Sequence, residues 1–311
     1  MKWYKLMAIL GACLFATFLV GACTPVPANT SAPSDADILL TAQASNPLPT
    51  EFANQGLSVV KPQACLVDKF VSVQVNDENT LPQMNDPQGD MIAWSPVGDE
   101  LAYVTPANGG WAWFVGNLVV FDMKTNKVIF TSNNQQVSGD LTWSPDGKWL
   151  AYIVLDAKTK IYTIDVLDMQ TGTSQDIFTA VSPQTDNWAS PKGITGWTNA
   201  NTLMVTSSCD VDCSRSYSYD LQSGKLTAQG DGRKKDDLSL NVTNQPVSPD
   251  AKWQVAVDTN NNAWISGKTS GQASIISSGS PIDEIKWSHD SSYLAMRTDD
   301  SIIIYEPVCA K

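Results

Sequence analysis

Short runs of alternating apolar and polar residues recur along the chain between Met91 and Glu306, and turn residues separate them. Two such runs are Leu118–Phe121 and Lys127–Phe130, which flank a turn that ends in Asn126. A period of two residues is typical of strands with one buried face, and a short turn between two runs predicts an antiparallel hairpin. The pattern therefore predicts an all-β chain built from hairpins.

One hairpin motif recurs five times along the chain with nearly the same sequence. A run ends in Trp, a turn of the Ser-Pro-Asp-Gly type follows, and the next run begins Leu-Ala-Tyr or similar. Pro presets φ in such a turn, Asp can bind its own backbone, and Gly tolerates a positive φ. The copies are centred on Trp94, Trp143, Trp197, Val247 and Trp287. We expect three of these tryptophans, Trp94, Trp143 and Trp287, to pair across the hairpin with the alanine eight residues later, Ala102, Ala151 and Ala295.

A second turn follows each of the first four copies. Its four forms are Asp122–Asn126, Asp168–Gly172, Asp220–Gly224 and Gly267–Gly271. Two hairpins make a four-stranded blade, and blades around an axis make a β-propeller. Five copies predict five blades, with six as the alternative because Gly56–Pro62 could add strands to a further blade. The last copy supplies only three strands, so we expect Phe70–Val75 to add the fourth and to close the ring.

These motifs resemble the TolB-like, WD40-like (PD40-type) propeller repeats, whose usual form is Trp-Ser-Pro-Asp-Gly, a small apolar strand and Asp-x-x-Thr-Gly. The resemblance covers residues 88–311. The third copy has lost Ser-Pro-Asp-Gly, and the fourth has Val247 in place of Trp. The resemblance implies the propeller fold, and by analogy with TolB it implies a role as a partner in a protein complex.

The start of the chain reads as an export signal over residues 1–22. Lys2 and Lys5 precede the apolar run Leu6–Val20, which is too short and too near the terminus for a membrane span. The segment ending Val-Gly-Ala-Cys23 resembles a bacterial lipobox, in which the cysteine carries the lipid; an ordinary signal peptide is the alternative. Residues 23–54 are rich in Pro, Ser, Ala and Thr and predict a disordered tether, with the propeller domain at 55–311. We therefore expect an extracytoplasmic protein held at the bacterial cell membrane by lipid on Cys23.

Four cysteines remain once Cys13 leaves with the signal and Cys23 is lipidated. An even number in an exported protein favours disulfides, with three possible connectivities. We favour Cys209 with Cys213, and Cys65 with Cys309, because the second bridge would staple the first and last segments of the ring. A metal site at Cys209–Cys213 is the alternative.

The net charge and the lack of catalytic motifs in the sequence exclude several classes of function. The chain has 32 acidic and 20 basic residues, a net charge of −12, so nucleic acid and anionic membrane surfaces would repel it. The only His, His289, stands in a repeat turn, and no Gly-x-Ser-x-Gly elbow occurs. Asp258–Asn262 has oxygen ligands but fails the calcium-loop pattern further on, so a hairpin turn is favoured. We predict no catalytic residue, cofactor or metal.

Several residues are candidates for contact with a ligand or partner. Asp90 and Asp283 lie four residues before the motif Trp of the first and last copies, while Asp140 and Glu284 lie three before, so all should stand near the mouth of a central channel. In a closed ring Asp90 and Asp283 could approach one another; solvated loop carboxylates are the alternative. The loop Pro106–Phe114 carries Trp111, Trp113 and Phe114, and Trp188 lies on another long loop. These aromatic residues either meet a partner or cap the core.

The sequence therefore predicts a lipid-anchored binding or scaffolding propeller at the cell envelope, with an envelope protein or a glycan as its partner. The alternative is an envelope carbohydrate-active enzyme that uses the carboxylates at the channel mouth.

Overall fold

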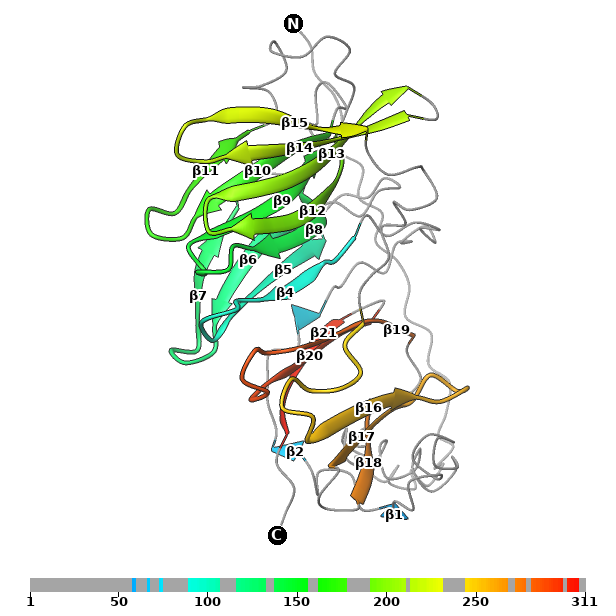
Figure 1. The fold of residues 1–311 in the computed structure, drawn as a ribbon. Helices are drawn as coiled ribbons and strands as arrows, with labels where there is room; N and C mark the ends of the chain where they lie inside the picture. The colour runs from blue at the N-terminus through cyan, green and yellow to red at the C-terminus, as the bar shows by residue number, and fades with distance from the viewer. Residues whose placement is uncertain are drawn as a thin grey trace, which may run out of the picture. The chain divides into compact units, whose positions relative to one another are not determined.

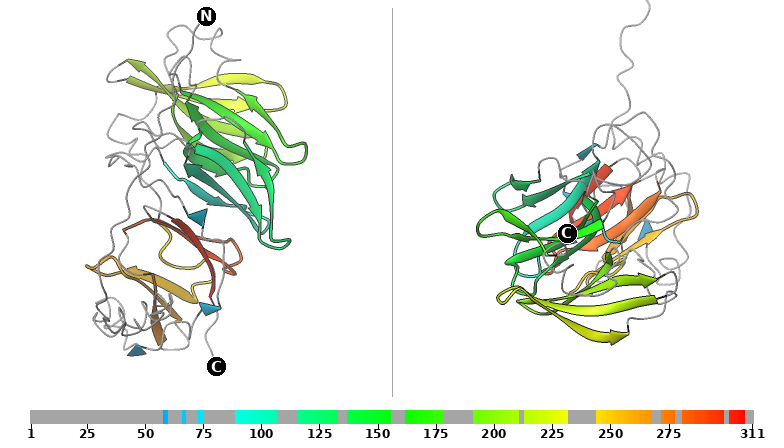
Figure 2. Two further views of the ribbon diagram at one scale, coloured as in Figure 1. Left: turned by 180° about the vertical axis from the view of Figure 1, so that it is seen from behind. Right: turned by 90° about the horizontal axis from the view of Figure 1, so that it is seen from above.

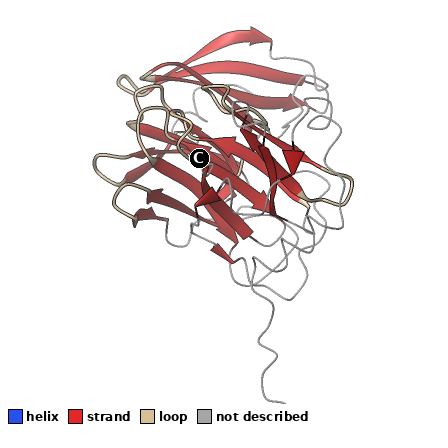
Figure 3. Ribbon diagram, turned by 90° about the horizontal axis from the view of Figure 1, so that it is seen from below, coloured by secondary structure: helices blue, strands red, loops and turns tan. Residues whose placement is uncertain are grey.

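The regular elements of the described chain are all β-strands. A computed structural model describes residues 58–59, 66–67, 73–74, 89–106, 116–132, 137–155, 162–177, 191–210, 213–231, 244–267, 272–277, 281–298 and 301–307. They belong to one compact unit, Asp35–Lys311. Figure 3 shows the described ribbon as strands and loops. Among the described residues, no helix long and apolar enough to cross a membrane is present. The predicted all-β class is confirmed.

The strands follow one another in antiparallel meanders, which are the blades of a β-propeller (Figure 1). Blade 1 contains β4 (Ile92–Trp94), β5 (Glu100–Pro106), β6 (Gly116–Asp122) and β7 (Lys127–Thr131). Blade 2 contains β8 (Val137–Trp143), β9 (Trp149–Leu155), β10 (Tyr162–Asp168) and β11 (Thr173–Asp176). Blade 3 contains β12 (Pro191–Asn199), β13 (Thr202–Asp210), β14 (Cys213–Asp220) and β15 (Lys225–Asp231). Blade 4 contains β16 (Trp253–Val257), β17 (Ala263–Gly267) and β18 (Gln272–Ser277), and blade 5 contains β19 (Ile282–Trp287), β20 (Leu294–Thr298) and β21 (Ser301–Pro307). The number of blades in the complete ring stays a prediction.

Segments from the N-terminal part of the chain complete the last two sheets. In blade 5, β2 (Leu66–Val67) and β3 (Val73–Gln74) pair antiparallel with β21. The prediction that Phe70–Val75 adds the missing strand is confirmed at Val73–Gln74. The short strand β1 (Ser58–Val59) pairs parallel with β18 of blade 4. The prediction that this region could begin a further blade is wrong at Ser58–Val59, because β18 offers it an open edge.

Neighbouring blades share apolar cores, as faces of packed sheets do. Val104 of blade 1 clusters with Tyr152 of blade 2, and Ile153 of blade 2 clusters with Val205 of blade 3. Two further clusters join blade 4 to blade 5 and blade 5 to blade 1. The first and last blades are therefore neighbours, as a closed ring requires. Figure 2 shows the strands of each blade from two more directions.

A buried serine fixes the repeated turn. The hydroxyl of Ser144 accepts the N–H of Trp149 at 3.0 Å and donates to Asp146 Oδ1 at 2.8 Å. Ser248 and Ser288 make the same two bonds in blades 4 and 5. The backbone N–H of Ser144 also donates to the carbonyl of Trp149 at 2.8 Å, which closes the hairpin. The sequence predicted roles for the Pro, Asp and Gly of this turn but not this role for the serine.

This closure corrects the expected pairing of the motif tryptophans. Trp143 lies opposite Leu150, and Ala151 lies opposite Thr142. Trp94 and Trp287 likewise pair with Leu101 and Leu294. The expected Trp–Ala pairing is therefore wrong by one residue, because the bond between Ser144 and Trp149 makes the loop tighter than the residue count assumed.

The second turn forms as predicted. Asp122 Oδ1 accepts the N–H of Lys124 at 2.8 Å, and the Thr125 hydroxyl donates to Asp122 Oδ2 at 2.6 Å. The turn ends with a positive φ, which is 56° at Asn126 and 69° and 64° at Gly172 and Gly224. Gly and Asn are the residues that adopt this conformation most readily, so the end of the motif follows from backbone sterics.

The motif tryptophans link each blade to the one before it. Each bond runs from an indole N–H to a backbone carbonyl. Trp143 Nε1 donates to the carbonyl of Ala93 at 3.0 Å, and Trp94 Nε1 donates to the carbonyl of Lys286 at 3.1 Å. Trp197 Nε1 donates to the carbonyl of Thr142 at 3.3 Å. In each case the acceptor immediately precedes the motif Trp of the preceding blade. We call this series of bonds, by which Trp94, Trp143 and Trp197 join blades 5, 1, 2 and 3, the indole relay. It gives the recurrence of Trp a direct physical reason.

The indole relay is interrupted at blade 4. Val247, which stands where the motif Trp would be, has no N–H in its side chain. The Nε1 of Trp287 is buried and has no hydrogen-bond partner among the described residues. The equivalent acceptor, the carbonyl of Pro246, accepts the N–H of Val255 at 2.7 Å instead. Neither Val247 nor Trp287 therefore contributes a bond to the indole relay.

Substitution of Trp143 by Phe tests the indole relay. The change keeps an aromatic ring but leaves the carbonyl of Ala93 without its donor, so we expect a loss of about 1–3 kcal/mol in the free energy of unfolding. The control is Trp253→Phe, which makes the same chemical change at a half-buried Trp outside the relay. Urea denaturation of both variants measures the difference. Equal losses in the two variants would show that ring size, and not the bond to blade 1, is what matters.

Candidate functional site

A network of charges occupies the junction of blades 5 and 1. Lys286 Nζ lies 2.6 Å from Asp90 Oδ2 and 3.9 Å from Glu284 Oε1. Arg297 Nε lies 3.2 Å from Glu284 Oε2, and its Nη1 lies 3.0 Å from Asp283 Oδ2. We call these five residues the junction network. It includes three of the four acids predicted from the sequence, Asp90, Asp283 and Glu284, and connects them through two cations that were not predicted.

Glu284 is the centre of the junction network. Its side chain is fully buried, and it accepts the backbone N–H groups of Met91 at 3.0 Å and Ile92 at 3.2 Å. One carboxylate from β19 therefore holds the start of β4. Burial raises the pKa of Glu284 to about 7, although Arg297 and Lys286 act in the opposite direction. The desolvation of the charged form outweighs the two cations.

The position three residues before the motif residue has the same use in other blades. Asp140 of blade 2 accepts the N–H of Ile194 of blade 3 at 2.7 Å, and Asn244 accepts the N–H of Ile285 of blade 5 at 2.8 Å. Burial raises the pKa of Asp140 to about 7, and Asp90 adds to this effect. We call Asp140, Asn244 and Glu284 the clamp residues. The expectation that Glu284 stands at a channel mouth is corrected, since its side chain is fully buried against the backbone of blade 1. Asp140 is half-buried, and its place at a channel mouth stays a prediction.

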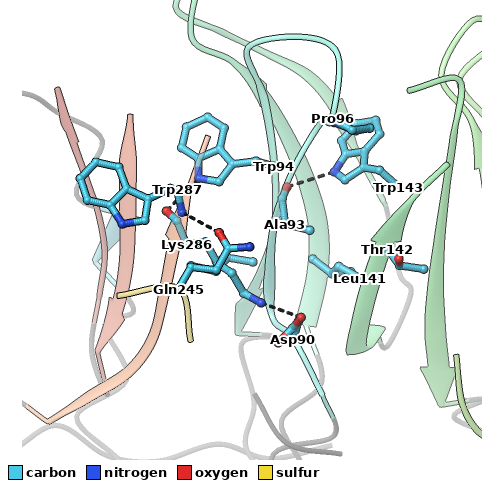
Figure 4. Close-up of a pocket in the computed structure, with 11 residues that line it drawn as sticks. Asp90, Ala93, Trp94, Pro96, Leu141, Thr142, Trp143, Gln245, Lys286 and Trp287 are labelled. Atoms are coloured by element: carbon cyan, nitrogen blue, oxygen red, sulfur yellow. Dashed lines mark hydrogen bonds and ion pairs between the residues drawn. The ribbon is translucent and has the colours of Figure 1, made fainter. Parts of the chain in front are cut away.

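A cavity of about 280 Å³ adjoins the junction network. Figure 4 shows its lining, with the Lys286–Asp90 ion pair and Gln245 below the indole rings. The Oε1 of Gln245 accepts the backbone N–H of Trp287 at 3.2 Å. The cavity is lined by Asp90, Ile92, Ala93, Trp94, Pro96, Leu141, Thr142, Trp143, Gln245, Lys286 and Trp287.

Two other sequence candidates are placed by the structure. His289 is exposed in the turn between β19 and β20. Asp258 closes the β16–β17 hairpin, where its Oδ1 accepts the N–H of Asn260 at 2.8 Å and its Oδ2 accepts Trp264 Nε1 at 3.0 Å. The predicted hairpin turn is confirmed. Within the ranges that the structure describes, no group of three or more His, Cys, Asp or Glu residues is arranged to hold a metal ion.

The remaining candidates lie wholly or partly outside the described residues. Outside are the signal and tether, together with Cys23, Cys65, Cys309, Trp111, Trp113, Phe114 and Trp188. Cys209 and Cys213 stand on β13 and β14, which form a hairpin in which Asp210 pairs with Cys213, but only the backbone is described there. Both disulfides, the lipid site and the aromatic contacts stay predictions.

No family model and no curated protein sequence matches the chain. Among solved structures it is similar to the β-propeller domain of Cps50 (Swd1) from Myceliophteria thermophila, with 14% identity over 70% of this chain and 64% of that chain and a TM-score of 0.32. TolB from Acinetobacter baumannii is 16% identical over 70% of this chain and 54% of that chain, with a TM-score of 0.31. A chain of the Mitotic Checkpoint Complex is 11% identical over 78% of this chain and 98% of that chain, with a TM-score of 0.36. The chain spans less than two thirds of the length of the first two structures. The assignment of the propeller fold rests on the sheets of this chain itself.

Substitution of Glu284 by Gln tests the cost of its burial through pH. The folded-state pKa of about 7 lies above the ordinary value of 4.5, so the folded chain holds this proton more tightly than the unfolded chain. The stability from this group is therefore complete below its unfolded pKa and is lost as the pH rises through its folded pKa. We expect wild type to lose up to about 3 kcal/mol more than Glu284→Gln between pH 4.5 and pH 8.

Chemical denaturation at several pH values measures this difference in slope. Glu306→Gln is the control, because it removes one carboxylate from an exposed site on β21. Wild type and Glu284→Gln with parallel pH profiles would contradict the prediction.

Proposed function

We propose that this chain is an exported β-propeller, held at the bacterial cell envelope by lipid on Cys23, that works as a binding or scaffolding module. The basic start at Lys2 and Lys5, the apolar run and the lipobox-like Val-Gly-Ala-Cys23 support the export and the anchor. The tether over residues 23–54 would let the propeller reach ligands at a distance from the bilayer.

The observation that carries the binding role is how the junction network uses its acids. A glycosidase needs two carboxylates that flank the scissile bond, one of them able to give up a proton. Here Asp90 pairs with Lys286 and Asp283 pairs with Arg297, while Glu284 is bound to the backbone of blade 1. Asp90 and Glu284 thus link blade 1 to blade 5, and Asp283 is held within blade 5. A frame joined in this way is a firm support for recognition loops, so binding is favoured over the carbohydrate-active alternative.

The recognition surface in this proposal is formed by the long loops. Trp111, Trp113, Phe114 and Trp188 are aromatic residues on such loops, and aromatic side chains supply much of the energy at protein interfaces. The net charge of −12 favours a neutral or basic partner surface. An envelope protein or a glycan meets this description.

Labelling of cells with a radioactive fatty acid tests the anchor. We expect wild type to carry the label and to sediment with membranes, while Cys23→Ser carries none and is released, because the thiol is the attachment point. Cys13→Ser is the matched control and should behave as wild type. Labelled, membrane-bound Cys23→Ser would rule out this anchor.

Photo-crosslinking in intact cells tests the binding role. A photoreactive amino acid at Trp113 or Trp188 should give one shared crosslinked product, while the same amino acid at Gln222, an exposed turn residue of blade 3, should not. Hydrolysis of envelope glycans by the purified chain, lost in Asp90→Asn, would instead support the enzyme.

A further inference from the structure

We propose that the cavity at blades 5, 1 and 2 binds a small neutral polyol, such as the terminal sugar of a glycan. This inference rests on the proposed function, because it names the ligand class of the same binding module. It is carried by the residues of the cavity wall, their fixed orientations and their charges.

The cavity has two kinds of wall. Its volume of about 280 Å³ is close to the lower end of the range for small-molecule sites, about 300 Å³. Asp90, Lys286 and Gln245 contribute polar groups, and Trp94 and Trp143 contribute indoles on the other side (Figure 4). A sugar ring has hydroxyl groups at its edge and C–H groups on its faces, so a site with one polar and one aromatic wall suits it.

The wall residues are held in place before any ligand arrives. Trp143 and Trp94 are fixed by the indole relay, and Trp94 also stacks on Tyr293 with ring centres 5.8 Å apart. Lys286 is fixed by Asp90. Because Gln245 Oε1 accepts the N–H of Trp287, its amide Nε2 is oriented as a donor. Groups that are already ordered lose little entropy on binding.

The charges of the site select against ionic ligands. Asp90 lines the cavity, with the clamp residues Asp140 and Glu284 close enough that Asp90 raises the pKa of both. These acids and the net charge of −12 repel anions. The buried ammonium group of Lys286 in the same wall repels cations. A hydroxyl group is neutral and both donates and accepts, so it can donate to a carboxylate of the wall and accept from an ammonium or amide group of the same wall.

Titration of the full-length chain with defined sugars tests the inference. The chain is kept in a detergent without a sugar head group, and the neutral probes are glucose, galactose, N-acetylglucosamine and maltose. Glucuronate and glucosamine are the anionic and cationic probes. Saturation-transfer NMR and tryptophan fluorescence report binding. We expect at least one neutral probe to bind and both charged probes to bind at least tenfold more weakly.

Two variants place the binding in this cavity. Gln245→Ala should weaken the best neutral probe about three- to tenfold, the range for one lost neutral hydrogen bond, and Asp90→Asn should weaken it about tenfold or more. Gln222→Ala, an exposed glutamine in the β14–β15 turn, is the matched control and should bind as wild type. Gln245 is exposed, so its variant keeps the fold even if loss of Asp90 loosens the junction.

Three outcomes would overturn the inference. They are no binding of any neutral probe, tighter binding of a charged probe, and wild-type affinity in folded Gln245→Ala. If the sugars fail while Cys23 is labelled and Trp113 still crosslinks to its partner, the proposed function stands without this ligand. Sugar binding by an unlabelled chain would support the cavity and not the anchor.

Discussion

The hydrogen bonds from the indoles of Trp94, Trp143 and Trp197 to the blade before each of them are the constraint on which the rest of the structure depends. Two apolar sheets that pack face to face could slide past one another at little cost, but an N–H and a carbonyl that lose each other away from water cost about 1–3 kcal/mol, and less where the pair is only partly buried. The bond from Trp143 to Ala93 therefore fixes the register of blades 1 and 2. The clamp residues act in the opposite direction, since Asp140 accepts from the blade after it. Together they fix the inner strands on both sides.

The junction network joins the two ends of the repeat array, and its burial has a cost. Buried ion pairs contribute little net stability, but removing one member leaves an unpaired charge and is strongly destabilising. Glu284 therefore acts mainly by specifying which strand lies beside β19. Lys286 connects this junction to the cavity wall, because its carbonyl accepts the Trp94 indole while its ammonium group holds Asp90. Closure of the array and the shape of the cavity thus depend on the same residue.

The sequence was sufficient to predict turns whose hydrogen bonds join neighbouring residues, and it was insufficient to predict contacts between residues far apart in the chain. The turn Asp122–Asn126 could be predicted because its bonds join residues within one short segment. The predicted hairpin register was wrong because the hydroxyl of a serine closes the loop, and residue spacing alone does not reveal that bond. The bond from Met91 to Glu284 was missed because the two residues are 193 positions apart in the sequence. Arg297 did leave a signal, since it is a charged residue in the buried run Leu294–Thr298.

The pairing of β2 and β3 with β21 sets the order in which the molecule can be completed. These strands come from the beginning of the domain, yet their hydrogen-bond partners, Ser301–Pro307, are the last residues of the final sheet. A chain that emerges N-terminus first must keep β2 and β3 without these partners until nearly all of it has been delivered. A product that stops before Ser301 would expose this early segment, and proteases that sample unpaired backbone would recognise the incomplete molecule.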